Sequence, residues 1–568
     1  MQLNGAQILL ECLKKEGVDV FFGYPGGAVI DIYDEIPRHP ELHHVLVRHE
    51  QAAVHAADGY ARASGKVGVC LVTSGPGATN TVTGIATAYS DSIPVVILTG
   101  QVPTPLIGND AFQEVDIVGI TRPCTKHNYL VRDVKELATV VRQAFYLART
   151  GRPGPVLVDL PKDVMQAKTD FVWPEDVSMR SYNPTYKPNL NQIRRAADAF
   201  FEAERPLLFV GGGVVMSDAS EELGWFARTL RIPVASTLMG LGAFPGDDPL
   251  WLGMLGMHGT YAANKAVNNA DLIVAVGARF DDRVTGRLSA FASKARIIHI
   301  DIDPTSIRKN VQVGIPVVGD CRQSLANIRE ILVPRLEEKD WGAAHARWLE
   351  QLASWRVEQP LGFSREGGIK PQQVIEQLFA ITRGDAIITT EVGQNQMWTA
   401  QFYTFRKPRT LITSGGLGTM GYGFPAAIGA QFAFPDKLVV DVAGDGSIQM
   451  NIQELATAVC NKLPVKILIL NNGYLGMVRQ WQELFYQRNY CSTCMDAQPD
   501  FVKLAEAYGA EGYRITEVES LESTLREALA SPHPAIIDVR VEREENVYPM
   551  VPAGAALDEM LLAFRVSG

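Results

Sequence analysis

Short apolar runs alternate with longer amphipathic segments along almost the whole chain, and this rhythm limits the possible folds more than any other feature. Runs such as VGVCLV at 67–72 and LIVAV at 272–276 have the length of buried strands. The segments between such runs are long enough for a crossover helix. Strands that alternate with helices in this way form βαβ units and parallel sheets. The sequence therefore predicts an α/β protein.

The predicted strands fall into three blocks, and the 568 residues suffice for three or four domains of roughly 150 residues each. A polar, proline-bearing stretch at 173–188 separates the first two blocks, and a charged helical segment with a following loop at 336–368 separates the last two. We predict three doubly wound parallel-sheet domains, at residues 1–185, 186–360 and 361–568. The predicted strands are 67–72, 95–98, 156–160, 206–210, 232–235, 272–276, 297–302, 386–389, 438–442, 465–470 and 535–539.

Charge and cysteine usage exclude several classes of function. The chain has 53 basic and 63 acidic residues, and a net charge of −10 disfavours binding to nucleic acid or to an anionic membrane. No apolar run reaches the roughly 18 residues needed to span a bilayer. The N-terminus carries no targeting pattern, so we expect a cytoplasmic protein. The seven cysteines are scattered, and Cys491 and Cys494 lack the further ligands that a zinc site needs.

Two polar motifs follow neighbouring strands in the third block. Gly444-Asp445-Gly446 directly follows one predicted strand, Asn472 directly follows the next, and a helix is expected at 447–461 between them. Both motifs should therefore meet at one carboxyl edge of the sheet. Carboxylate and amide oxygens suit Mg²⁺, which completes its shell with phosphates. The glycines and the start of the helix favour an anion.

A Gly-Asp-Gly turn followed after 24 residues by Asn-Asn resembles the cofactor motif of the thiamine diphosphate-dependent enzymes. The resemblance implies that Asp445, Asn472 and the carbonyl of Tyr474 hold the metal. These enzymes also need a carboxyl group that hydrogen-bonds N1′ of the cofactor's pyrimidine. Glu50, after a short predicted strand at 45–47 and before small residues, resembles that acid. Relatives place it and the metal motif on different subunits, which implies at least a homodimer.

The rest of the chain resembles the catalytic subunits of the biosynthetic acetohydroxyacid synthases, also called acetolactate synthases. The motifs occur in order and cover essentially the whole chain. They are SGPGATN at 74–80, GQVP at 100–103, DAFQE at 110–114, GRPGP at 151–155, LPKD at 160–163, LGMHG at 255–259, GARFDDR at 277–283, SGGLGTMG at 414–421 and YPMVP at 548–552.

This resemblance implies roles for individual residues. Met420 would wedge beneath the cofactor, and the backbone at Gly418 and Met420 would bond the pyrimidine edge. Arg283 would grip a 2-keto acid carboxylate. Trp481 would favour the extra methyl of 2-ketobutyrate by roughly 1–3 kcal/mol. The other implied residues are Val392, Gly393, Gln394, Asn395, Gly446 and Ser447 near the diphosphate, Gln113 and Lys162 as catalytic residues with Phe112 beside them, and Met257 and His258 near the cofactors.

Alternatives stay open for some of these positions. Trp481 and Met257 could serve packing alone. Lys162 could be an ordinary surface lysine, and His258 could be a loop histidine whose hydrogen bonds are satisfied within the protein. Asn395 stands where most relatives have histidine. An asparagine can donate a hydrogen bond to phosphate but carries no charge, so we expect a modest effect on cofactor affinity and no change of reaction type.

The second block carries signs of another cofactor. A glycine-rich turn follows the predicted strand 206–210, and acidic residues end the strand 297–302. These features alone allow NAD, FAD, CoA or no ligand, whereas the family resemblance implies FAD without a redox role. The implied contacts are Arg152, Gly211, Gly212, Gly213, Thr237, Leu238, Gly277, Arg279, Asp301, Ile302 and Asp320.

The resemblance implies that the protein decarboxylates pyruvate on thiamine diphosphate. The resulting hydroxyethyl carbanion would condense with pyruvate or 2-ketobutyrate, the first common step of branched-chain amino acid biosynthesis. Family members usually work with a small regulatory subunit.

Three other functions compete with this one. They are a pyruvate oxidase, which would use the flavin for electrons, a catabolic acetolactate synthase without FAD, and a non-catalytic nucleotide-binding protein of the same fold. The segments around Gln113, Trp481 and Arg283 favour the synthase, and the retained Glu50, Asp445 and Asn472 argue against the non-catalytic alternative.

Overall fold

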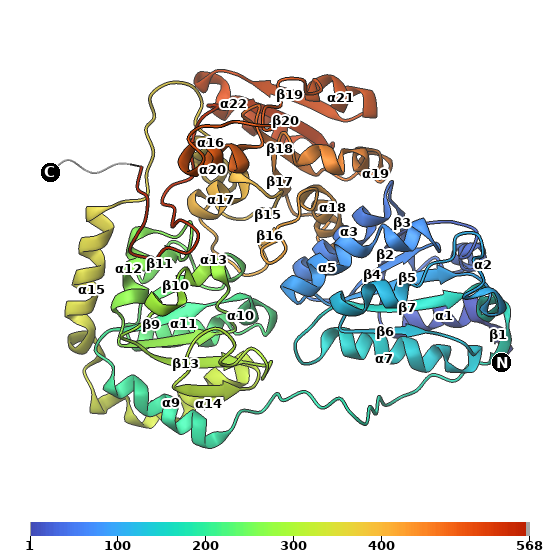
Figure 1. The fold of residues 1–568 in the computed structure, drawn as a ribbon, viewed down its shortest axis with the longest axis horizontal. Helices are drawn as coiled ribbons and strands as arrows, with labels where there is room; N and C mark the ends of the chain where they lie inside the picture. The colour runs from blue at the N-terminus through green and yellow to red at the C-terminus, as the bar shows by residue number, and fades with distance from the viewer. Residues whose placement is uncertain (1, 564–568) are drawn as a thin grey trace.

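The chain forms three domains, each built on a six-stranded sheet with helices packed on its faces (Figure 1). The computed structural model describes residues 2–563. All strand pairings within the three sheets are parallel. The predicted α/β class is confirmed. One sheet lies within each of the three predicted segments, at residues 20–161, 206–318 and 387–540.

The N-terminal sheet has the strand order β3-β2-β4-β5-β7-β6. A short antiparallel pair, β1 (Gln2–Asn4) with β8 (Lys168–Asp170), closes the domain and has no counterpart among the predicted strands. The sheet strands are β2 (Val20–Tyr24), β3 (His43–Leu46), β4 (Gly68–Val72), β5 (Val95–Gln101), β6 (His127–Leu130) and β7 (Val156–Pro161). The helices are α1 (Gly5–Lys15), α2 (Ile30–Glu35), α3 (Glu50–Ser64), α4 (Pro76–Thr79), α5 (Val82–Asp91), α6 (Ile117–Thr121), α7 (Leu137–Arg149) and α8 (Lys162–Gln166).

The central sheet has the order β11-β10-β9-β12-β13-β14 and packs against a hydrophobic core of its own. Its strands are β9 (Pro206–Val210), β10 (Val234–Ser236), β11 (Trp251–Met254), β12 (Leu272–Val276), β13 (Arg296–Asp301) and β14 (Ile315–Val318). The helices are α9 (Leu190–Glu202), α10 (Gly212–Met216), α11 (Ser220–Thr229), α12 (Tyr261–Asn269), α13 (Asp282–Thr285), α14 (Cys321–Leu332) and α15 (Trp341–Glu358).

The C-terminal sheet has the order β16-β15-β17-β18-β20-β19. Its strands are β15 (Ile387–Thr390), β16 (Leu411–Thr413), β17 (Val439–Gly444), β18 (Lys466–Asn471), β19 (Glu511–Ile515) and β20 (Ala535–Arg540). The helices are α16 (Pro371–Thr382), α17 (Gln394–Phe402), α18 (Gly423–Ala433), α19 (Leu455–Cys460), α20 (Gly476–Phe485), α21 (Phe501–Tyr508) and α22 (Val518–Ala530).

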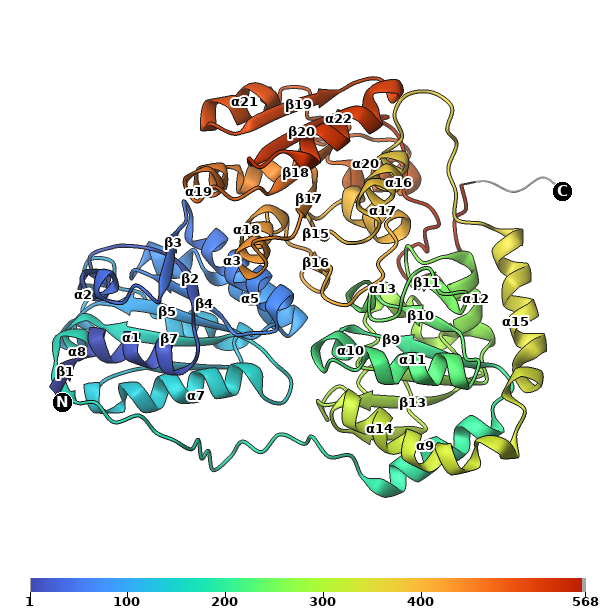
Figure 2. The same ribbon diagram turned by 180° about the vertical axis from the view of Figure 1, so that it is seen from behind.

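Helix α3 of the N-terminal domain packs against helix α18 of the C-terminal domain, and both views show them side by side (Figures 1 and 2). The two domains share one hydrophobic core along this contact. Helix α3 begins at Glu50, where the ring of His49 accepts a hydrogen bond from the Gln51 amide at 3.1 Å, and it ends before the left-handed Gly65. Glu50 thus stands at the free end of a helix that is fixed between two domains.

Two further segments tie the domains together. An extended stretch between β8 and α9 connects the N-terminal domain to the central one, and the chain after β20 returns to the central domain (Figure 2). There the Val551 amide donates to the Met257 carbonyl at 2.8 Å. Within residues 2–563, none of the helices combines the length and apolar character required to cross a membrane.

Candidate functional site

The Gly-Asp-Gly turn and Asn472 meet at one sheet edge, as predicted, because β17 and β18 run parallel as neighbours. Asp445 is buried, and within residues 2–563 its Oδ1 has no hydrogen-bond partner. Burial raises the pKa of Asp445 to about 7. The side-chain oxygen of Asn472 accepts the Tyr474 amide at 3.1 Å. A buried carboxylate oxygen without a partner, beside an amide oxygen, fits the ligands that Mg²⁺ takes in proteins.

The helix predicted at 447–461 is wrong. Two 3₁₀ turns, Ile448–Met450 and Ile452–Glu454, precede the short helix α19. Asn451 separates the two turns, and its side-chain amide donates to the Gly421 carbonyl at 2.6 Å. This contact with a distant turn outweighs the helical apolar spacing of the segment. No α-helix starts at Ser447, so the expected support of an anion by a helix dipole is absent there.

The predicted diphosphate segment runs from the end of β15 into α17. Val392, Gly393 and Gln394 all face the same cavity. The side-chain amide of Asn395 donates to the Glu391 carbonyl at 3.1 Å and to the Val442 carbonyl at 2.8 Å. The expected hydrogen bond from Asn395 to phosphate therefore competes with two backbone acceptors that already use its donor group.

Glu391 is a functional candidate that sequence reasoning missed. It is fully buried, and its carboxylate accepts the Gly421 amide at 2.6 Å and the Phe424 amide at 3.2 Å. Burial raises the pKa of Glu391 to about 7. It thereby anchors the turn that carries Gly418 and Met420. The available signal was an acidic residue directly after a strand and directly before Val392.

One cavity of about 1100 Å³ joins the C-terminal and central domains and holds most of the predicted site. It brings together residues predicted for the metal, the diphosphate, the pyrimidine, the flavin and the substrate. From the C-terminal domain it is lined by Val392, Gly393, Gln394, Asn395, Gly418, Met420, Asp445, Gly446, Ser447, Asn472, Tyr474 and Trp481. The predicted residues that line it from the other two domains are Arg152, Gly211, Gly212, Gly213, Thr237, Leu238, Met257, His258, Gly277, Arg279, Arg283, Asp301, Ile302 and Asp320.

The central-domain wall of this cavity contains two backbones in close approach. A Cβ at Gly213 would lie 2.6 Å from the Cα of Gly277, so neither turn has room for a side chain. Asp301 ends β13, and its carboxylate accepts the Asp303 amide at 2.8 Å. Arg152 reaches in from the N-terminal domain and pairs with Asp303 at 3.0 Å. Open glycine backbone and a carboxylate at a strand end suit a nucleotide-bearing cofactor such as FAD.

Arg283 and Trp481 come from different domains and meet at the mouth of the cavity. The Arg283 guanidinium lies 6.0 Å from the centre of the Trp481 ring, and the Arg283 side chain is more than half exposed. Met257 lies beside the same guanidinium. His258 is buried, with a pKa lowered to about 4 by burial, and its Nδ1 lies 3.2 Å from the Pro549 carbonyl. A cation beside an aromatic wall can hold a small carboxylate with an apolar tail.

Three predicted residues lie elsewhere, at the carboxyl edge of the N-terminal sheet. The Glu50 carboxylate accepts the Asn80 side-chain amide at 2.9 Å, and Lys162 donates to the Gly27 carbonyl at 2.9 Å. Gln113 packs against Gly75 at the same edge, next to the highly exposed Phe112. None of these residues is among those that line the large cavity within the described chain. One chain therefore presents two separate half-sites: the N-terminal half-site with Glu50, Gln113 and Lys162, and the metal half-site, which is the large cavity with Asp445 and Asn472.

The Cys491 and Cys494 pair stays outside both half-sites. Both thiols are exposed, and neither forms a disulfide. Within residues 2–563 no group of three or more His, Cys, Asp or Glu side chains is arranged to hold a metal ion.

Three family descriptions match successive parts of the chain. They are "Thiamine pyrophosphate enzyme, N-terminal TPP binding domain" at residues 3–120, "Thiamine pyrophosphate enzyme, central domain" at residues 193–328, and "Thiamine pyrophosphate enzyme, C-terminal TPP binding domain" at residues 391–539. Thiamine pyrophosphate is another name for thiamine diphosphate. The matches follow the order of the three sheets, and the third covers the Gly-Asp-Gly turn and Asn472.

Curated proteins align with nearly the whole chain. The acetolactate synthase isozyme 3 large subunit of Escherichia coli is 52% identical over 99% of both chains. The acetolactate synthase large subunit of Haemophilus influenzae is 50% identical over 99% of this chain and 98% of its own. Acetolactate synthase 2 (chloroplastic) of Nicotiana tabacum is 48% identical over 98% of this chain and 85% of its own.

Proposed function

The chain belongs to the acetolactate synthase large-subunit family of thiamine pyrophosphate enzymes, and we propose on that premise that it is an acetohydroxyacid synthase catalytic subunit. It removes CO₂ from pyruvate and joins the remaining two-carbon unit to the ketone of a second 2-keto acid. With pyruvate the product is 2-acetolactate, and with 2-ketobutyrate it is 2-aceto-2-hydroxybutyrate. This reaction is the first common step of branched-chain amino acid biosynthesis.

The observation that carries this proposal is the single cavity in which a metal-type carboxylate, a glycine-rich turn and an arginine–tryptophan pair meet. Thiamine diphosphate, when bound, supplies the electron sink that carbon–carbon bond cleavage beside a carbonyl requires. In this chain Asp445, Asn472 and the Tyr474 carbonyl would hold Mg²⁺. The segment Val392–Asn395 would receive the diphosphate, and the turn with Gly418 and Met420 would hold the pyrimidine.

The substrate side of the cavity supports selection of a second 2-keto acid. Arg283 projects toward Trp481 across the domain boundary, and its guanidinium can hold a carboxylate through two hydrogen bonds. The indole offers an apolar surface to the alkyl end of the same molecule. An extra methyl group buried there favours 2-ketobutyrate over pyruvate by roughly 1–3 kcal/mol. Arg283 and Trp481 thus orient the acceptor and discriminate between the two substrates.

We propose that the working enzyme is at least a homodimer. Glu50, Gln113 and Lys162 gather at an edge of the N-terminal domain that does not reach the cavity of the same chain. A carboxyl group that hydrogen-bonds the pyrimidine must contact the cofactor directly, so a second copy has to bring Glu50 to it. The exposed Phe112 beside Gln113 is an apolar side chain that such an interface would cover.

Three further parts of the proposal concern FAD, a second subunit and location. The glycine backbones at Gly213 and Gly277 and the carboxylate of Asp301 would receive FAD, which takes no part in electron transfer in the main reaction. Relatives carry the name "large subunit", which supports a small regulatory partner. None of the seven cysteines, all of which lie within residues 2–563, forms a disulfide, and that supports a reducing compartment such as the cytoplasm.

Product analysis tests the proposed function. The purified chain is mixed with thiamine diphosphate, Mg²⁺, FAD, pyruvate and 2-ketobutyrate, with and without an electron acceptor. Acetohydroxy acids formed without the acceptor support the synthase. Acetate formed only with the acceptor would identify a pyruvate oxidase instead. A chain that binds the cofactors but forms neither product, even with a regulatory subunit from a relative, would contradict the proposal.

A further inference from the structure

The segment Tyr89–Ser92, at the end of α5 in the N-terminal domain, lies where all three domains meet. All four of its residues line the large cavity. From the central domain the Arg279 guanidinium donates to the Ser90 carbonyl. Arg152 donates to the Ser92 hydroxyl at 2.8 Å. The segment is therefore held on both sides of Asp91.

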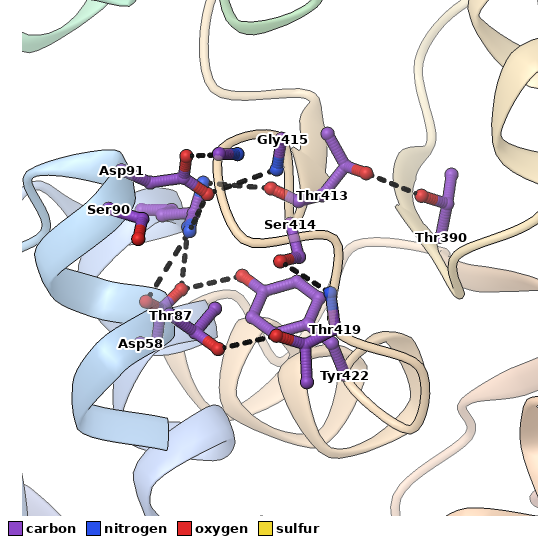
Figure 3. A network of polar contacts seen from close by, with 12 residues as sticks. Asp58, Thr87, Ser90, Asp91, Thr390, Thr413, Ser414, Gly415, Thr419 and Tyr422 are labelled. Atoms are coloured by element: carbon purple, nitrogen blue, oxygen red, sulfur yellow. Dashed lines mark hydrogen bonds and ion pairs between the residues drawn. The ribbon is translucent and has the colours of Figure 1, made fainter. Parts of the chain in front are cut away.

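Asp91 reaches from this segment to the glycine-rich turn of the C-terminal domain (Figure 3). Its carboxylate accepts the Gly416 amide at 2.7 Å and the Gly415 amide at 3.1 Å. The same carboxylate pairs with Arg62 at 2.9 Å, and both side chains are buried. A buried carboxylate that accepts two backbone amides and one guanidinium is fixed in both position and direction.

Arg62 extends this contact to both ends of the turn. Its guanidinium donates to the Thr413 carbonyl at 2.9 Å and to Asp58 at 2.6 Å. Asp58 in turn accepts the hydroxyl of Tyr422 at 2.6 Å (Figure 3). Thr413 precedes the turn and Tyr422 follows it. One buried arginine thus links helix α3 to the start and the end of the turn.

A third contact lies in the middle of the turn. The hydroxyls of Thr87 and Thr419 lie 2.7 Å apart, and the Thr419 amide donates to the Ser414 hydroxyl at 3.0 Å. Thr419 stands between Gly418 and Met420, the two residues predicted to contact the pyrimidine. The N-terminal domain therefore holds the turn at its start, its middle and its end.

Stability alone does not explain this network. Burial of the three charged side chains Asp58, Arg62 and Asp91 costs desolvation energy, and apolar side chains of similar volume often give a fold the same stability. Buried ionic groups are best attested where they fix one arrangement among several. The arrangement fixed here is the placement of a glycine-rich turn, which has little intrinsic rigidity of its own.

We propose that Asp91, oriented by Arg62, is a positioning residue that holds the turn 414–421 in the conformation that binds the pyrimidine of thiamine diphosphate. The inference rests on the proposed function, because it assumes that this turn receives the cofactor. Asp91 does not itself touch the reacting atoms. It acts through the Gly415 and Gly416 amides, and its loss leaves the metal ligands in place.

The test is Asp91→Asn, with binding of thiamine diphosphate read from tryptophan fluorescence at saturating Mg²⁺. Asn keeps the volume but loses the charge, so it weakens the bonds to Arg62 and to the two amides. We expect the dissociation constant to rise at least about tenfold, the loss of one charge-assisted hydrogen bond. We also expect kcat at saturating cofactor to fall while the KM for pyruvate stays within about twofold.

The matched control is Glu16→Gln. Glu16 is also a buried carboxylate of the N-terminal domain, and it pairs with Arg142 at 2.6 Å and with Arg149 at 2.8 Å. Arg149 borders the cavity but Glu16 does not, and the Glu16 carboxylate bonds these two arginines and not the turn 414–421. Both variants should lower the thermal midpoint, and only Asp91→Asn should weaken cofactor binding. Equal cofactor affinity in Asp91→Asn and Glu16→Gln would overturn the proposal.

A milder variant keeps the test decisive if Asp91→Asn does not fold. Thr87→Val removes one hydroxyl on the N-terminal side, and Thr419→Val removes its partner. Both single variants should weaken cofactor binding by about threefold, and the double variant should add little to either. Wild-type affinity in Thr87→Val would contradict the inference. Because binding is read without turnover, a wild-type chain that binds the cofactor but makes no acetohydroxy acid overturns the proposed function and not this inference.

Discussion

Replacement of Gly59 by alanine should separate the two helices on which the site is built. Gly59 lies inside α3, and a Cβ there would sit 2.6 Å from the Cα of Ala426 in α18. Ordinary contacts of this kind begin near 3.4 Å. The carbonyl oxygen of Ala426 would lie closer still, so the helices must move apart by about 1 Å at this point. Gly429 makes the reciprocal approach, because a Cβ there would lie 2.8 Å from the carbonyl carbon of Ala56.

The magnitude follows from two opposing effects. Alanine in place of glycine inside a helix gains up to about 1 kcal/mol of stability. Overpacking against backbone that cannot rotate away typically costs about 1–3 kcal/mol, and sometimes more. We expect Gly59→Ala to lose about 1–2 kcal/mol net. Since α3 begins at Glu50 and α18 follows the Met420 turn, a shift near 1 Å should also lower kcat by roughly tenfold to a hundredfold.

Chemical denaturation and initial-rate kinetics measure both effects, with Gly224→Ala as the matched control. Gly224 lies inside α11, and the nearest atom to a Cβ there is the flexible tip of Arg228 at 3.0 Å. Because that tip can move, Gly224→Ala should be neutral or stabilising and fully active. If Gly59→Ala behaves like Gly224→Ala, the described contact between α3 and α18 is refuted.

Three further predictions concern the site and its surroundings. Trp481→Leu should reduce the preference for 2-ketobutyrate by roughly tenfold or more in competition assays with both substrates, because leucine offers a smaller apolar surface than the indole. An unchanged product ratio would show that Trp481 does not select the acceptor. Asp445→Asn should raise the Mg²⁺ concentration for half-saturation at least about tenfold, measured by fluorescence titration with thiamine diphosphate present, whereas unchanged Mg²⁺ dependence would exclude Asp445 as a ligand. Burial lowers the pKa of His55 to about 3 in the folded state, below the unfolded value near 6.5, so the unfolded chain takes up the proton first and stability is lost as the pH falls below about 6.5. Relative to His55→Phe, the wild type should lose about 2 kcal/mol between pH 6.5 and 5 in denaturation curves, and parallel pH profiles would contradict this.

The fold was predictable where strands are buried on both faces. Each predicted strand from 67–72 to 535–539 lies in one of the three sheets. Apart from the short pair of β1 and β8, six strands were not predicted. Of these, β2 lies inside its sheet, whereas β6, β11, β14, β16 and β19 are sheet edges. Edge strands are less completely buried, and their residues show weaker apolar runs, as in the HNYL of β6 and the EGYRI of β19. A short apolar run therefore marks most central strands, with β2 as the exception, and it is a poorer signal for an edge, where only β3 was predicted.

The candidate site was predictable only where a motif fixes a position on one strand end. Asp445 and Asn472 could be placed at one edge because each directly follows a strand. Glu391 could not be found in this way, since its role depends on amides of a turn thirty residues further along the chain. Asn451 broke the predicted helix for the same reason. Local patterns indicate strands and turns, whereas contacts between segments that are distant along the chain appear only in the folded structure.

The most direct test of the account is complementation between two inactive variants. Glu50→Gln disables the N-terminal half-site, and Asp445→Ala disables the metal half-site of the cavity. Co-expressed chains form mixed dimers in which one site carries both changes and the other carries neither. Acetolactate formation should then recover to about one quarter of the wild-type rate, as random pairing of the two chains requires. No activity above that of the separate variants would contradict a site shared between two copies of this chain.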